Sequence, residues 1–160
     1  MIVSEDQLVS ELWAWDVRFI MGAKPDYPPT LPPASLIAAL AESHEARLQL
    51  SLIPLFLRHP EFAAHIIAVS KKVDPAHQLI LKCFYSAAVW LEQKHLSQKN
   101  LPDLFSKDLG LSPTSNPEDN LRALAKRHQE LSGMQINWLG TYQHAADIWL
   151  KEVELQQEFP

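Results

Sequence analysis

Residues 76–91, near the middle of the chain, are apolar on most of their circumference when drawn as a helix. In the helix predicted to reach residue 94, the polar residues gather mainly in one narrow stripe, formed by Gln78, Lys82, Ser86 and Gln93. A helix of this kind is stable in water only when other elements surround it on several sides. We therefore expect residues 76–91 to be the central helix of a fold with several layers of helices. The apolar positions are Leu79, Ile80, Cys83, Phe84, Ala87, Ala88, Trp90 and Leu91.

Helix-start signals recur along the rest of the chain. Ser4 with Gln7 forms a capping box, and Asp74-Pro75 and Asn116-Pro117 each pair an N-cap residue with a first-turn proline. No segment alternates apolar and polar residues between hairpin turns, so a sheet is not predicted. The fold class that we predict is all-α, a single compact bundle spanning 1–160 with about seven helices. The predicted helices cover residues 5–21, 36–42, 45–57, 60–72, 75–94, 117–132 and 137–153.

Two segments interrupt the helical pattern. Residues 23–34 hold five of the 12 prolines, so we expect an extended strap there. Tyr27 and Leu31 would pin the strap onto its own domain, or the strap would be a ligand for an aromatic-lined groove of another protein. Residues 96–115 combine prolines and a glycine with several leucines, which predicts a loop held down by apolar anchors. Within the third helix, Pro54 predicts a kink or a break over 51–54.

Composition excludes several classes of function. The chain has 160 residues, 14 basic and 19 acidic, and a formal net charge of -5, so nucleic acid is not an expected partner. With a single cysteine, Cys83, the chain cannot form an intrachain disulfide. Glu5 and Asp6 are acidic at positions where a secretory signal peptide carries basic residues. The most apolar stretch, 48–57, is too short to cross a membrane. We expect a cytoplasmic protein without a bound cofactor and without a membrane contact.

Arg58 and His65 are the candidate catalytic residues. Such a pair has a coherent chemistry, with the histidine as general base toward a ribose 2'-hydroxyl and the arginine stabilising the negative charge that develops on phosphorus. The segment Arg58-His59-Pro60-Glu61-Phe62-Ala63-Ala64-His65 resembles the arginine-to-histidine spacing of HEPN ribonucleases, and Arg122 with His128 has a similar spacing. The resemblance implies metal-independent RNA cleavage, although Pro60 is expected to divide the pair between two helices.

Glu61 and His65 are also the candidate metal ligands. They lie four residues apart and would share one face of a helix. The sequence offers no HExxH motif to supply further ligands, so a divalent-metal site is kept as a third alternative.

The aromatic residues of the terminal helices are the candidate partner-binding residues. Trp13 and Trp15 point to opposite sides of the first helix, and Trp138, Tyr142 and Trp149 form a stripe on the last helix. Such aromatic residues either belong to the core or anchor a partner. We predict that Trp13, Trp138, Tyr142 and Trp149 bind a partner protein.

Residues 34–65 carry two resemblances. Their short helix, turn and Glu45-Ala46-Arg47 entry into a longer helix resemble a HEAT-like helical unit. The same stretch resembles small bacterial helical proteins encoded beside minimal nucleotidyltransferases, which implies a partner or antitoxin-type subunit. Our leading prediction is therefore a non-enzymatic helical protein-interaction module that binds another protein or a second copy of itself.

Overall fold

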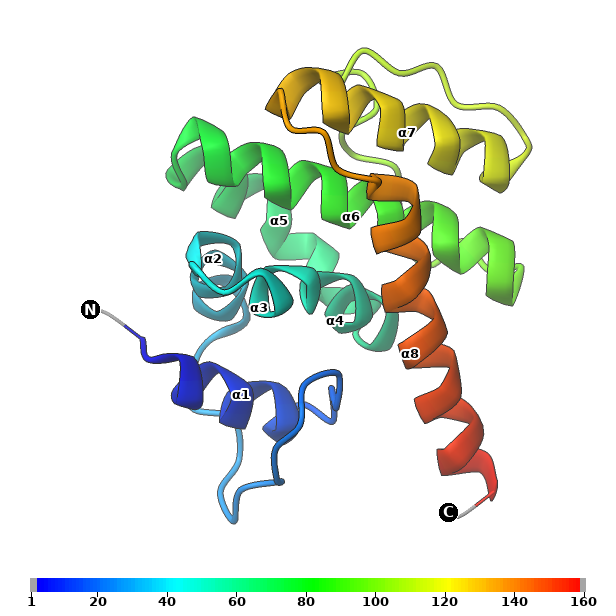
Figure 1. The fold of residues 1–160 in the computed structure, drawn as a ribbon. Coiled ribbons are helices and arrows are strands. Elements are labelled where there is room, and N and C mark those ends of the chain that lie inside the picture. Colours follow the sequence, from blue (N-terminus) through cyan, green and yellow to red (C-terminus); the bar gives the residue numbers. More distant parts are fainter. Residues whose placement is uncertain (1–2, 159–160) are drawn as a thin grey trace.

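The computed structural model describes residues 3–158, with side chains described as far as Leu155, and every regular element in this range is helical (Figure 1). This confirms the predicted all-α class. Eight α-helices and one 3-10 turn are present in residues 3–158, and only Ser51 separates α3 from α4, so the two count as one broken helix in a bundle of seven. The elements are α1 (Glu5–Ala14), α2 (Pro33–Glu42), α3 (Ala46–Leu50), α4 (Leu52–Arg58), η1 (Pro60–Phe62), α5 (Ala63–Lys72), α6 (Pro75–Leu96), α7 (Pro117–Ser132) and α8 (Trp138–Glu158).

The long helix α6 lies at the centre of the molecule, as predicted. It packs most extensively against α7 on one side and α4 on another, and it also contacts α2, α5 and α8. Cys83 and Tyr85 are fully buried core residues on it, and this burial raises the pKa of the Cys83 thiol to about 12, which makes the thiol unreactive.

Three N-caps that the sequence predicts are formed. The side chains of Ser4, Asp74 and Asn116 accept hydrogen bonds from backbone N–H groups in the first turns of α1, α6 and α7. Asn116 accepts two of them, from Glu118 at 2.9 Å and from Asp119 at 3.2 Å.

We expect Asn116→Ala to lower the free energy of unfolding by about 1 kcal/mol, because it leaves two N–H groups of α7 without their acceptor. Urea denaturation measures this loss. Asn100→Ala, at an exposed loop position, is the control and should change the midpoint much less.

The first helix is shorter than predicted. It ends at Ala14 instead of 21 because Asp16 adopts a left-handed conformation (φ 61°), and the Val17 N–H then bonds the Leu12 carbonyl at 2.8 Å. This is a Schellman-type end with aspartate in the place that glycine usually occupies.

The proline-rich strap is present, but it ends at Pro32, because Pro33 already forms the first residue of α2. Leu31 is buried, as predicted, whereas Tyr27 is 51% exposed and does not pin the strap. The strap is held instead by the carboxylate of Glu11, which is 1% exposed. It accepts the N–H of Thr30 at 2.9 Å, the N–H of Leu31 at 2.6 Å and the Thr30 hydroxyl at 3.0 Å.

The predicted break within 51–54 is found at Ser51, whose hydroxyl bonds the Leu48 carbonyl. Pro54 then lies in the first turn of α4, where its missing N–H costs no helical hydrogen bond.

The loop after α6 is anchored as the sequence indicates, by Leu101, Phe105 and Leu109, which are buried. The carboxylate of Glu92 accepts the Leu101 N–H at 3.0 Å and fastens the loop to α6.

Within residues 3–158 no single helix is both long and apolar enough to cross a bilayer. Ala46–Arg58 and Pro60–Lys72 reach that length and hydropathy only when taken together, and they meet at a bend of 110°.

Candidate binding groove

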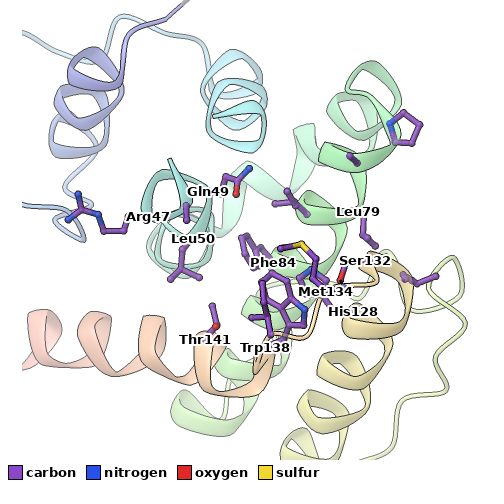
Figure 2. A pocket seen from close by; sticks show the side chains of 16 residues that line it. Arg47, Gln49, Leu50, Leu79, Phe84, His128, Ser132, Met134, Trp138 and Thr141 are labelled. Atoms are coloured by element: carbon purple, nitrogen blue, oxygen red, sulfur yellow. Dashed lines mark hydrogen bonds between the residues drawn. The ribbon is translucent and has the colours of Figure 1, made fainter. Parts of the chain in front are cut away.

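An apolar groove of about 680 Å³ opens where α3, the first half of α6, the end of α7 and the start of α8 meet (Figure 2). Its volume falls in the usual range of ligand-binding clefts. Leu50 stands on the α3 side, Leu79 and Ile80 on the α6 side, and Ile136 in the α7–α8 connection. We call this cavity the α6–α8 groove.

The inner wall of the α6–α8 groove is aromatic. The imidazole of His128 stacks on the indole of Trp138, with ring centres 3.6 Å apart and planes 12° from parallel. Phe84 meets both rings edge-on, at 6.0 Å from His128 and 6.2 Å from Trp138. In Figure 2 the side chains of Phe84, Met134 and Trp138 converge at the centre of the groove.

His128 is fixed in its place by Tyr142. Its Nδ1 lies 2.6 Å from the Tyr142 hydroxyl, and both residues are buried. Burial lowers the pKa of His128 to about 4 and raises the pKa of Tyr142 well above its usual value, so both side chains are neutral near pH 7. The inner wall therefore offers aromatic surface and no charge.

The other polar side chains that line the groove are bonded within the chain. Gln49 donates to the carbonyls of Ala41 and Ser43, and the Thr141 hydroxyl donates to the Asn137 carbonyl at 3.1 Å. The Ser132 hydroxyl accepts the Met134 N–H at 3.2 Å, and Arg47 pairs with Glu45 at 3.6 Å. One polar atom, the buried Nε1 of Trp138, has no hydrogen-bond partner.

Two apolar side chains at the rim extend this surface outwards. Leu131 is 42% exposed and Met134 is 52% exposed. They flank Gly133, which ends α7 in a left-handed conformation (φ 69°) and turns the chain toward α8. Leucine and methionine side chains exposed beside an apolar cavity form a continuous patch, which is typical of an interaction site.

The four predicted partner-binding residues have different environments. Tyr142 is fully buried and Trp149 is nearly so, so both pack in the core. Trp13 is partly buried and donates from Nε1 to the Ile20 carbonyl at 2.8 Å. Trp138 is partly buried and lines the groove. Of the four predicted residues, it is therefore the one that belongs to this site.

The candidate catalytic pair lies on two helices. Arg58 is the last residue of α4 and His65 belongs to α5, beyond the bend at Pro60. Burial raises the pKa of the Glu152 carboxyl on α8, and the charges of Arg18 and Arg58 partly oppose that rise. Ribonuclease activity stays a prediction.

The candidate metal pair is likewise divided between two elements, since His65 belongs to α5. Glu61 lies in η1, and its carboxylate pairs with His59 Nδ1 at 3.2 Å. Among residues 3–158, no three His, Cys, Asp or Glu side chains gather closely enough to hold a metal ion.

The α6–α8 groove could not be predicted from the sequence, because its walls come from four separate helices. A local signal was present in the segment from Leu131 to Ile136, which places three large apolar residues around a helix-ending glycine. Large apolar residues that cluster at an exposed helix end are one pointer to a binding surface. In comparisons with known proteins, the chain matches no protein-family model, no curated protein and no solved structure.

Proposed function

We propose that this protein is a non-enzymatic interaction module whose α6–α8 groove receives apolar side chains from a protein helix. The observation that supports this proposal is that exposed apolar residues lie at the rim of an apolar cavity. A small molecule inside the cavity would leave Leu131 and Met134 in water, whereas a protein surface would cover them.

The chemistry of the lining also favours binding. Gln49, Ser132 and Thr141 already have partners within the chain, and His128 is held by Tyr142. Because these polar side chains are already bonded within the chain, the free energy that this surface offers a ligand comes mainly from burying apolar area. A partner or antitoxin-type subunit of a bacterial cytoplasmic system is one form that this function would take.

Site-directed photocrosslinking tests the proposal. A benzophenone amino acid replaces Met134 at the rim, and in a matched control it replaces Met21, an equally apolar side chain that is 96% exposed outside the groove. We expect one predominant polypeptide to crosslink from position 134 in the cells that make the protein, and not from position 21.

A second variant makes the test specific to the groove. Ala76 lies at the groove entrance in the first turn of α6, where a glutamate suits the helix dipole and does not disturb folding. Ala76→Glu should reduce the crosslink from position 134 about tenfold, because it places a charge where apolar side chains enter. Equal crosslinking from positions 134 and 21, or none from 134, would sink the proposed function.

A further inference from the structure

Met134 places a sulfur atom at the rim of the α6–α8 groove. It lies in the segment that joins α7 to α8, and it is 52% exposed. Figure 2 shows its side chain over the centre of the groove, whose inner wall includes Phe84 and Trp138. An apolar side chain that enters the groove would therefore contact Met134. A chemical change of this one thioether alters the surface that the entering side chain meets.

The backbone of Met134 is held independently of its side chain. Its N–H donates to the Ser132 hydroxyl at 3.2 Å, and its carbonyl accepts the N–H of Ile136 at 2.9 Å. The residue lies between α7 and α8, outside both helices, and its side chain does not belong to the buried core. A modification of this side chain should therefore change the groove and leave the fold intact.

An exposed thioether reacts with hydrogen peroxide and related hydroperoxides. A lone pair of the sulfur attacks one peroxide oxygen, and the O–O bond breaks as the S–O bond forms. The departing hydroxide takes the proton of the transferred hydroxyl group and leaves as water. The sulfur is thus oxidised by two electrons to the sulfoxide, and the peroxide is reduced. Among the described residues, the sulfur of Cys83 is fully buried, which leaves Met21 and Met134 open to this reaction.

We propose, on the basis of the proposed function, that Met134 is a peroxide-oxidation site that controls what the α6–α8 groove accepts. With the thioether in place, the rim is apolar and the groove receives apolar side chains. The sulfoxide instead places a polar oxygen at the entrance, and an apolar side chain offers no donor to replace the water that hydrates it. We expect the affinity of the groove for apolar groups to fall about fivefold or more on oxidation.

Binding of the dye anilinonaphthalene sulfonate tests this proposal without knowledge of the partner, because the dye fluoresces on apolar protein surface. The purified chain is titrated with the dye before and after treatment with hydrogen peroxide, and mass spectrometry of its peptides locates the added oxygen. The dissociation constant of the dye should rise about fivefold or more when Met134 is oxidised. Methionine sulfoxide reductases with a thiol reductant should restore the original value.

Two leucine variants assign the effect to one sulfur atom. Leucine keeps the apolar character and nearly the volume of methionine but cannot be oxidised in this way. Met21 is 96% exposed outside the groove, so oxidised Met21→Leu should lose dye affinity as the original chain does. Oxidised Met134→Leu should keep its affinity, and urea denaturation should give the same midpoint before and after oxidation. An equal loss in Met134→Leu, or no loss in the original chain, overturns the proposal.

Photocrosslinking from the other rim residue separates this proposal from the proposed function. Leu131, which is 42% exposed, carries the benzophenone, and Met134 stays in place. We expect peroxide to weaken the crosslink to the partner, and we expect the crosslink to persist when Met134→Leu is added. A crosslink that survives oxidation equally in both chains rejects control by Met134 and keeps the proposed function. If positions 131 and 134 crosslink nothing, yet dye binding is lost through Met134, the partner helix is rejected and control of the groove by Met134 is supported.

Discussion

Lowering the pH from about 7 to about 4 is expected to reduce the free energy of unfolding by about 3 kcal/mol through His128 alone. In the folded chain burial lowers the pKa of this imidazole to about 4, whereas its ordinary value is 6.5. Between these two pH values the unfolded chain binds a proton that the folded chain excludes. The contribution to stability is therefore complete above about pH 6.5 and is lost as the pH falls toward 4.

Urea denaturation at about pH 7, 5.5 and 4 measures this dependence. His128→Gln keeps a polar group opposite the Tyr142 hydroxyl but does not titrate, so its stability should fall less over the same range. His44→Gln, at an exposed position, should keep the pH dependence of the original chain. Parallel curves for the original chain and His128→Gln would show that acid sensitivity comes from other groups.

Removal of the buried carboxylate that holds the strap should have an effect of similar size. Glu11→Ala leaves the N–H groups of Thr30 and Leu31 without an acceptor, and each unsatisfied group costs about 1–3 kcal/mol. We expect a total loss of about 3 kcal/mol in the free energy of unfolding. Hydrogen exchange should also accelerate at Thr30 and Leu31 while the amides of α6 keep their relative order of protection.

Glu11→Gln separates hydrogen bonding from packing at this position. Its amide has nearly the same shape, but only its oxygen can accept the hydrogen bonds that two carboxylate oxygens accept now. It should therefore fall between the original chain and Glu11→Ala in stability. A Glu11→Ala variant as stable as the original chain would mean that the strap is held by Leu31 alone.

Sequence reasoning was most successful where the physics is local. The starts of α1, α6 and α7 depend on Ser4, Asp74 and Asn116, whose side chains bond amides two or three residues away. The end of α1 was missed because aspartate at position 16 takes a left-handed conformation that glycine adopts far more often. Such an end depends on packing by the following chain, which includes the buried Val17.

Features that depend on distant parts of the chain could not be predicted in the same way. In the sequence, Glu11 looks like a solvent-exposed residue of the first helix. It is buried only because the strap, nearly 20 residues later, covers it and donates hydrogen bonds to its carboxylate. Tyr142 and Trp138 are four residues apart on one stripe, yet one is in the core and the other lines the groove. Periodicity locates the stripe, while the neighbouring helices decide how far each ring is covered.

The break at Ser51 has a consequence for how this protein could acquire new binding preferences. It separates α4, whose side chains are nearly all buried, from α3, where Leu48 is the buried residue. Ala46, Arg47 and Leu50 therefore line the groove from a short helix that carries little of the core. Because Ala46 and Arg47 are exposed, substitutions there can alter which side chains the groove accepts at little cost to folding, whereas Leu50 also packs against the core.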